Sequence, residues 1–207
     1  MENVWLYDIE VFKEDWLIIF HPIDGGERLV IHNDCQLVRE FIDSIEPVLA
    51  GYNVKHYDQH ILRCIYHQAP NNIVKICNDY IIGGNQGWTS DWFKRKDKLP
   101  GCQIDLMDDI PVPLRLKEIE ANIGMSIIES KIPFDIDRAL TEKELDEVTR
   151  YCHHDVDATM KLFELRKDYL LSKISVGALK AIPWAESASL TNAKLTARYL
   201  GAQLVER

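Results

Sequence analysis

Residues 3–11 read Asn-Val-Trp-Leu-Tyr-Asp-Ile-Glu-Val, an apolar run interrupted by two acids. Apolar residues occupy both alternating sets, which predicts a central β-strand covered on both faces. Because side chains alternate along a strand, Asp8 and Glu10 project from the same face as Val4 and Leu6. Two carboxylates so placed repel each other and resist desolvation unless a cation lies between them. This strand therefore also predicts a divalent metal site.

Composition is that of a globular protein. The chain has 207 residues, 46% hydrophobic and 28% charged, enough for one sizeable core and a short appendage. It contains no apolar run long enough to span a membrane and no signal-peptide pattern at the N-terminus, so we expect a cytoplasmic protein without a membrane partner. The five cysteines include no C-x-x-C pair, which argues against a zinc cage and a disulfide framework.

The net charge of −9 does not indicate a nucleic-acid binder, but it does not exclude one. Enzymes that cleave phosphodiesters with metals carry clustered acids, and a local basic strip can guide the backbone. The best such strip is Lys94-Arg95-Lys96-Asp97-Lys98, which follows Trp88, Trp92 and Phe93. Aromatic and cationic side chains of this kind can stack on and steer a single strand, although a solvated loop is the alternative.

The pattern beyond the first strand predicts an α/β domain. Pro22 and Asp24-Gly25-Gly26 separate two further strands as a hairpin, and a helix capped by Asp34 leads to a strand expected to run parallel to the first. The expected strands cover residues 16–20, 28–31, 47–51 and 103–107. The expected helices cover residues 34–45, 58–66, 72–82, 114–123 and 141–171, with helices at about 176–181 and 190–204 in the tail.

Three further acidic or aromatic residues lie on these helices. Asp58 falls in the first turn of its helix, where the helix dipole favours a carboxylate. The helix from Thr141 begins with a T-x-x-E capping box, and its apolar stripe includes Tyr151 and Asp155, whereas Asp157 lies on the opposite side. A carboxylate on a core-facing stripe needs a partner, so Asp155 is a candidate functional residue.

Each of these residues also has an ordinary structural interpretation. Asp58 alone is what any first helical turn favours, and Tyr151 alone is a core aromatic residue. His153 and His154 flank the stripe and are expected on the helix surface. Asp105, at the end of the predicted fifth strand, is expected to cap or pair locally.

Taken together, the motifs D-x-E, G-Y-N-x(3)-Y-D and Y-x(3)-D resemble the three motifs of the DEDD 3′→5′ exonuclease superfamily. Their order, spacing and expected elements agree over residues 1 to about 171. Arg150 stands where the histidine subclass has its histidine, so the resemblance is to the tyrosine subclass, DEDDy. It is greatest to the proofreading domain of a phage-type DNA polymerase. It implies a ribonuclease H-like fold, a mixed β-sheet flanked by α-helices, with a site formed by Asp8, Glu10, Asp58, Tyr151 and Asp155.

The resemblance also implies a two-metal mechanism with Mg²⁺ or Mn²⁺, ions that prefer oxygen ligands. Asp8 would bridge both ions, Glu10 and Asp155 would complete the ion that holds the nucleophilic water, and Asp58 would support the second. Tyr151 would orient the attacking water. The expected activity is release of nucleoside monophosphates from the 3′ end of single-stranded DNA.

Weaker implications concern substrate contacts and domains. Asn53 corresponds to an asparagine that touches the substrate strand, and Lys131 lies near the position of a lysine close to the scissile phosphate. A turn residue and a solvated lysine are the alternatives. Residues 1–171 would form the exonuclease domain, and residues 172–207 a helical extension that could lead to a DNA polymerase domain or partner.

Two other functions stay open at this point. An RNA 3′-end processing exonuclease of the RNase D kind shares the tyrosine constellation, and the metal ligands do not encode the sugar of the substrate. A non-catalytic nucleic-acid-binding module of a polymerase could retain the fold. The sequence does not distinguish a fragment of a longer polymerase from a free-standing nuclease.

Overall fold

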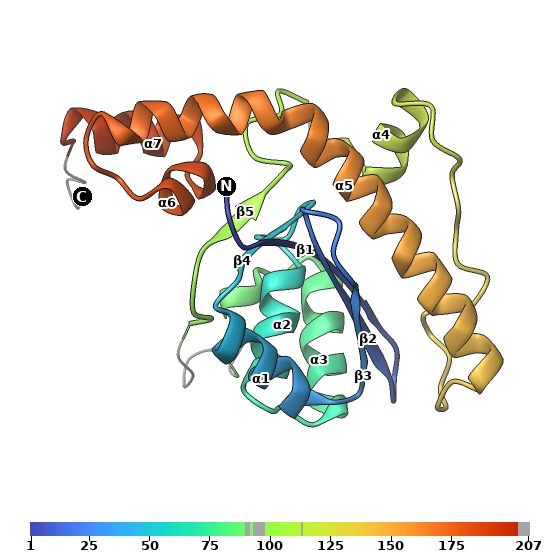
Figure 1. Cartoon of the computed structure of the whole chain (residues 1–207). Coiled ribbons are helices and arrows are strands. Elements are labelled where there is room, and N and C mark those ends of the chain that lie inside the picture. The colour runs from blue at the N-terminus through green and yellow to red at the C-terminus, as the bar shows by residue number, and fades with distance from the viewer. Residues whose placement is uncertain (90–91, 93–97, 113, 203–207) are drawn as a thin grey trace.

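The computed structural model describes residues 1–89, 92, 98–112 and 114–202, apart from the side chain of Trp88. Its strands are β1 (Val4–Val11), β2 (Trp16–Pro22), β3 (Leu29–His32), β4 (Val48–Gly51) and β5 (Gln103–Asp105). Its α-helices are α1 (Cys35–Ile45), α2 (Asp58–Tyr66), α3 (Asn71–Ile82), α4 (Leu116–Asn122), α5 (Glu142–Ala178), α6 (Trp184–Ser189) and α7 (Asn192–Leu200). They form a mixed α/β fold (Figure 1).

The five-stranded sheet has the order β3-β2-β1-β4-β5, so β1 is central as predicted. β1 pairs antiparallel with β2, which pairs antiparallel with β3, and this confirms the hairpin. β4 runs parallel to β1, and β5 runs parallel to β4. The helix between β3 and β4 makes the parallel pairing possible.

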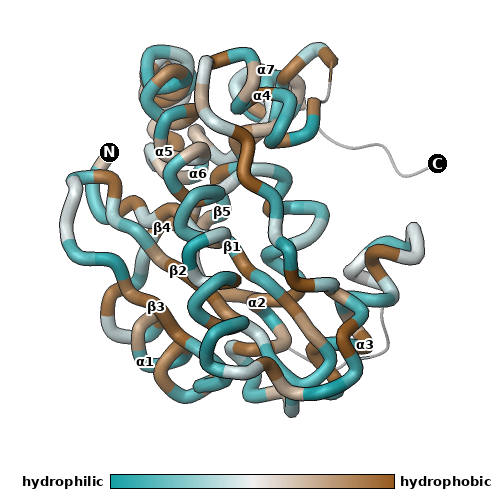
Figure 2. The backbone as a smooth tube through the Cα atoms, turned by 90° about the vertical axis from the view of Figure 1, so that its right-hand side faces the viewer, coloured by the Kyte–Doolittle hydropathy of each residue, from teal (hydrophilic) through white to brown (hydrophobic). Residues whose placement is uncertain are grey.

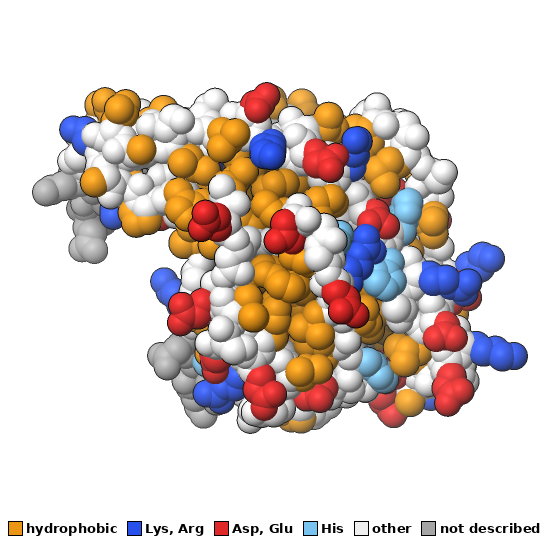
Figure 3. All heavy atoms as spheres, viewed as in Figure 1, with side chains coloured by type: hydrophobic (Ala, Val, Ile, Leu, Met, Phe, Trp, Pro, Cys, Tyr) orange, Lys and Arg blue, Asp and Glu red, His pale blue; other side chains and the backbone are white. Residues whose placement is uncertain are grey.

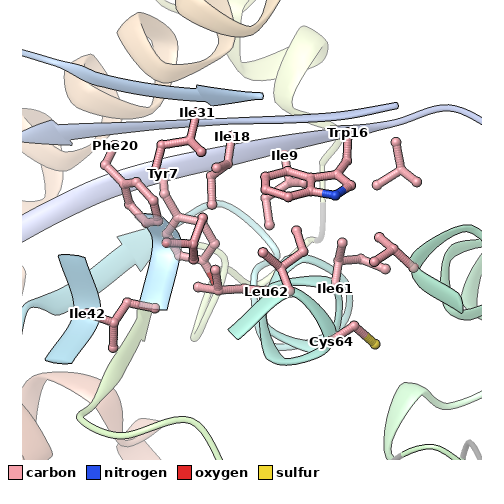
Figure 4. Packing of buried hydrophobic residues seen from close by; sticks show 14 of the residues in the cluster. Tyr7, Ile9, Trp16, Ile18, Phe20, Ile31, Ile42, Ile61, Leu62 and Cys64 are labelled. Atoms are coloured by element: carbon pink, nitrogen blue, oxygen red, sulfur yellow. The ribbon is translucent and has the colours of Figure 1, made fainter. Parts of the chain in front are cut away.

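Helices cover both faces of the sheet. Tyr7, Ile9 and Val11 belong to a buried cluster with α1, α2 and α3. Figure 4 shows this packing, with strand side chains directed toward Ile61 and Leu62 of α2. On the opposite face, the alternate β1 residues pack in a second cluster with α4, α5 and α6. The strands are strongly hydrophobic in Figure 2, as expected for a sheet buried on both sides.

Local signals define the starts of the helices. The Asp34 carboxylate accepts a hydrogen bond from the backbone N–H of Leu37 at 2.9 Å and caps α1. Thr141 and Glu144 form the predicted capping box of α5. α2 begins at Asp58, which confirms that this acid lies in a first helical turn.

The long helix and the tail differ from the prediction. α5 runs through residue 171 to Ala178, so the proposed domain boundary falls inside a continuous helix. The tail helices were predicted at 176–181 and 190–204, but α6 and α7 occupy 184–189 and 192–200. Gly177 permits this packing, because a Cβ there would lie 1.9 Å from the Ser187 Oγ atom of α6.

Two expectations concern the surface. α5 is 37 residues long, but neither it nor any other helix in the described ranges is apolar enough to cross a membrane. Most of the predicted basic strip, residues 94–97, lies outside the described residues, as does Phe93. Lys98, the last residue of the strip, is exposed, and the preceding Trp92 is half-buried.

Candidate metal centre

The site lies where β1 continues beyond its parallel neighbour. β4 pairs with β1 only through Val4–Leu6, so Asp8 and Glu10 lie past the end of β4. Gly51 ends β4, and the chain turns tightly there. The turn leaves no room for a side chain, because a Cβ at Gly51 would lie 3.0 Å from the Tyr7 carbonyl oxygen and 2.3 Å from a methyl group of Val54. The chain turns away at this point. A crevice at the carboxyl ends of parallel strands is a common ligand site in α/β folds.

The long helix α5 brings a third carboxylate to this crevice. Carboxylate oxygens of Asp8, Glu10 and Asp155 all lie within 4.8 Å of one another, and they could hold a metal ion. Glu10 and Asp155 are each only 7% exposed. Asp58 lies outside this set of three, but it is buried and lines the same cavity of about 710 Å³. The structure therefore gathers all four predicted acids around one cavity.

The acids carry raised pKa values. Burial, with the nearby Asp155 carboxylate, raises the pKa of Asp8 to about 7. Burial and then the charge of Asp8 raise the pKa values of Glu10 and Asp58 well above their ordinary range. Burial and mutual repulsion thus favour the neutral forms of these acids, and a bound cation would favour the ionised forms.

Two neighbouring side chains orient the acids. Tyr151 lies one helical turn before Asp155 on α5, and burial followed by the charge of Asp155 raises the pKa of Tyr151. Tyr151 thus stays a neutral donor beside the centre, although it is not among the residues that line the cavity. The Cys152 thiol lies 3.4 Å from the Asp8 Oδ2 atom and donates to it.

Lys117 was not predicted as a site residue. From α4, its ammonium group pairs with the Asp155 carboxylate, lies 3.2 Å from the Glu120 Oε1 atom and sits 4.7 Å from the centroid of the Tyr151 ring. Burial lowers the pKa of Lys117, but its bonds to Asp155 and Glu120 outweigh this and raise it above the ordinary value. The structure thus supplies one cation to the edge of the acidic cluster.

Glu120 and His154 extend the cluster and correct the sequence interpretation of the histidines. His154, expected on the helix surface, is mostly buried, and its Nε2 atom lies 3.5 Å from the Oε2 atom of the fully buried Glu120. His153 is also half-buried, with its Nδ1 atom 2.8 Å from Arg28. Ligand atoms of Glu120, His154 and Asp155 again lie within 4.8 Å of one another, so a second group that could hold a metal shares Asp155 with the first.

Asp105 has a wider role than the local pairing expected. Its carboxylate accepts hydrogen bonds from the backbone N–H groups of Asn53 at 2.8 Å, Lys55 at 3.0 Å and Met107 at 2.9 Å. It therefore fixes the segment between β4 and Asp58, where Asn53 adopts a left-handed backbone with φ of 60°. Met107 is the local partner that was expected, whereas Asn53 and Lys55 lie 52 and 50 residues away and could not be predicted from local sequence.

The two predicted substrate contacts lie in different places. Asn53 lines the cavity beside the acids. Lys131 is exposed and is not among the lining residues, so its contact with substrate stays a prediction.

Removing the Asp105 carboxylate is expected to loosen the segment that carries Asn53 and Asp58. We expect Asp105→Ala to lower the free energy of unfolding by roughly 2–3 kcal/mol, because three part-buried N–H groups lose a charged acceptor. Asp105→Asn, which keeps one acceptor oxygen, should lose less. Chemical denaturation with chelator present measures this, and unchanged stability in Asp105→Ala would show that other contacts hold the segment.

The raised pKa of Asp8 predicts a pH dependence of stability. The pKa is 3.8 in its ordinary state and about 7 in the folded protein, so between these values the folded state binds more protons than the unfolded state. The free energy of unfolding of the metal-free protein should therefore fall as pH rises from about 5 to about 8. Thermal melting with EDTA tests this, and Asp8→Asn should reduce the slope. A melting temperature that rises over this range in the wild type would contradict the prediction.

The comparisons with known proteins give no relative for this site: no family model matches the chain, and no curated protein matches it.

Proposed function

We propose that this protein is a metal-dependent 3′→5′ exonuclease of the DEDD superfamily, tyrosine subclass, with a ribonuclease H-like fold. One observation carries the proposal: carboxylate oxygens from β1 and α5, which are far apart in sequence, lie within 4.8 Å of one another. They belong to the first and the last of the three motifs. A central strand that bears two acids, with helices on both faces, is compatible with the proposed fold.

The donor set fits hard divalent ions. Asp8, Glu10 and Asp155 offer only oxygen atoms, and Asp58 offers another carboxylate in the same cavity. Mg²⁺ and Mn²⁺ prefer such ligands. The raised pKa values show that the carboxylates lack full compensation for their burial and mutual repulsion. When bound, two such ions would polarise the phosphoryl group and lower the pKa of a coordinated water.

The remaining residues have roles in binding and orientation. Tyr151, held as a neutral donor by its burial, would orient a water molecule near Asp155. Asn53 would contact the terminal nucleotide from the rim of the cavity. Phe134, which lines the cavity and is 46% exposed, stacks on Phe12 with 5.3 Å between ring centroids. An exposed ring of this kind can stack on a base without regard to its identity.

The experiment is digestion of a 5′-labelled single-stranded DNA oligonucleotide with Mg²⁺ or Mn²⁺, with EDTA as control and a matched RNA in parallel. A ladder of single-nucleotide steps on DNA, absent with EDTA, is expected. A ladder on RNA alone would assign the protein to RNA 3′-end processing instead. Shortening of the labelled oligonucleotide when its 3′ end is blocked would contradict a 3′→5′ exonuclease.

One observation favours a second candidate, a non-catalytic nucleic-acid-binding module. Lys117 already pairs with Asp155, so part of the acidic charge is compensated without a metal. Absence of both cleavage and Mn²⁺ binding in a calorimetric titration, with oligonucleotide binding retained, would establish that alternative.

A further inference from the structure

A second cavity, also of about 710 Å³, lies behind the segment that borders the metal centre. Tyr52, Asn53 and Tyr57 line the first cavity, whereas Lys55 and His56, from the same segment, line the second. The second cavity also takes residues from α2, from the stretch before β5 and from the start of α7. Figure 3 shows the molecule indented between its α6–α7 end and the body below.

The two cavities have opposite charge. The residues that line the first include six acids and two cations: Asp8, Glu10, Asp58, Asp79, Asp135, Asp155, Lys75 and Arg115. Those that line the second include four cations and one acid: Lys55, Arg63, Lys98, Lys194 and Asp108. The chain as a whole has a net charge of −9, so this concentration of positive charge runs against the average of the molecule.

Two of these four cations have no acidic partner within the described part of the chain. Lys55 pairs with Asp108 and also donates to the Ser189 carbonyl oxygen, so it serves the structure. Lys98 and Lys194 have no carboxylate within ion-pair distance among the residues that the structure describes. Lys194 lies in the first turn of α7, a nine-residue helix capped by Thr191, where the positive end of the helix dipole adds to the potential.

We propose that this second cavity binds backbone phosphates of a single-stranded polynucleotide whose 3′ end lies at the metal centre. The inference rests on the proposed function. A polyanion approaching a protein of net negative charge needs a local positive region, and this cavity provides one next to the acids. Because the 3′-terminal nucleotide occupies the first cavity, the second receives phosphates on the 5′ side of it. The segment that carries Asn53 and Tyr57 then forms the ridge that the strand crosses.

The test is binding, measured with EDTA so that no hydrolysis is needed. Fluorescence anisotropy would follow a fluorescein-labelled dT12 oligonucleotide over a range of salt concentrations, with wild type and the double variant Lys98→Ala/Lys194→Ala. The matched control is Lys143→Ala/Lys167→Ala, which removes the same charge from exposed positions on α5 that line neither cavity. Melting temperatures verify that all three proteins are folded.

We expect the cavity variant to bind dT12 about tenfold more weakly and to lose roughly 1.4 from the slope of log affinity against log salt, about 0.7 for each phosphate contact. The control variant should change little. Equal loss in both variants would mean a long-range charge effect and would overturn the inference, as would no loss in either. Inorganic phosphate should bind far more weakly than dT12, and comparable affinity would reassign the cavity to a small anion.

Failure of the proposed function has a different signature. Hydrolysis of the p-nitrophenyl ester of thymidine 5′-monophosphate by the wild-type protein reports on the metal centre alone. No hydrolysis with Mn²⁺, together with the expected loss of dT12 binding, would refute the nuclease and retain the phosphate cavity. Hydrolysis of the ester, together with unchanged dT12 binding in the cavity variant, would support the metal centre and refute the phosphate cavity.

Discussion

Asp8→Asn should reduce metal-dependent hydrolysis by at least about a thousandfold, because the variant loses the carboxylate that would contact both ions. The same substitution should raise the melting temperature of the metal-free protein above pH 7. Asp8 is half-buried, with its carboxylate close to those of Glu10 and Asp155, and a neutral amide of the same shape removes both its desolvation cost and its repulsion. Opposite changes in activity and stability are typical of a residue retained for function.

The measurement pairs initial rates on labelled DNA with thermal melting in EDTA at about pH 8. Asp168→Asn, at an exposed position on α5, is the matched control and should change neither quantity. Wild-type activity in Asp8→Asn would remove Asp8 from the site. A marked loss of stability would mean that the carboxylate holds the fold rather than a metal.

Lys117→Met should destabilise the metal-free protein by about 1–3 kcal/mol, since Asp155 and Glu120 then keep their burial but lose their cation. The variant should also bind Mn²⁺ more tightly than the wild type does. In the wild type, a metal ion must displace or repel the ammonium group beside Asp155, whereas in the variant it meets an uncompensated carboxylate. Methionine keeps the length of the lysine stem, so the packing over Tyr151 is largely preserved.

Calorimetric titration with Mn²⁺ and chemical denaturation in EDTA measure the two effects. Lys167→Met, on the exposed side of α5, controls for the loss of one positive charge and for the added methionine. Weaker Mn²⁺ binding in Lys117→Met than in this control would show that Lys117 supports the metal site instead of competing with it.

Much of the fold could be predicted because its signals are local. The apolar run of residues 3–11 has the pattern of a doubly covered strand, and β1 is the central strand. Asp34 and Thr141 have the cap chemistry that starts α1 and α5. The end of α5 was missed because no breaker follows Leu171 directly. The helix instead continues to where Gly177 allows close contact with α6.

The motifs and the elements predicted to carry them indicated that the four acids would lie together, but their neighbours could not be predicted. Lys117 and Asp155 are 38 residues apart, and no local pattern indicates that α4 lies over α5. Glu120 did carry a signal, since Leu116, Ile119 and Ile123 place it on the apolar stripe of its own helix. Glu120, like Asp155, is a carboxylate on a core-facing stripe that needs a partner.

The contact between Lys117 and Asp155 also affects the metal-free state of the protein. Structural zinc domains unfold when chelated, because their ligands have no other means of compensation. Here the Lys117 ammonium group compensates part of the charge of Asp155, and burial favours the protonated forms of Asp8 and Glu10, so we expect the chain to fold without an ion. Chelation should accordingly silence this protein without denaturing it, and returning the ion should restore activity with no refolding step.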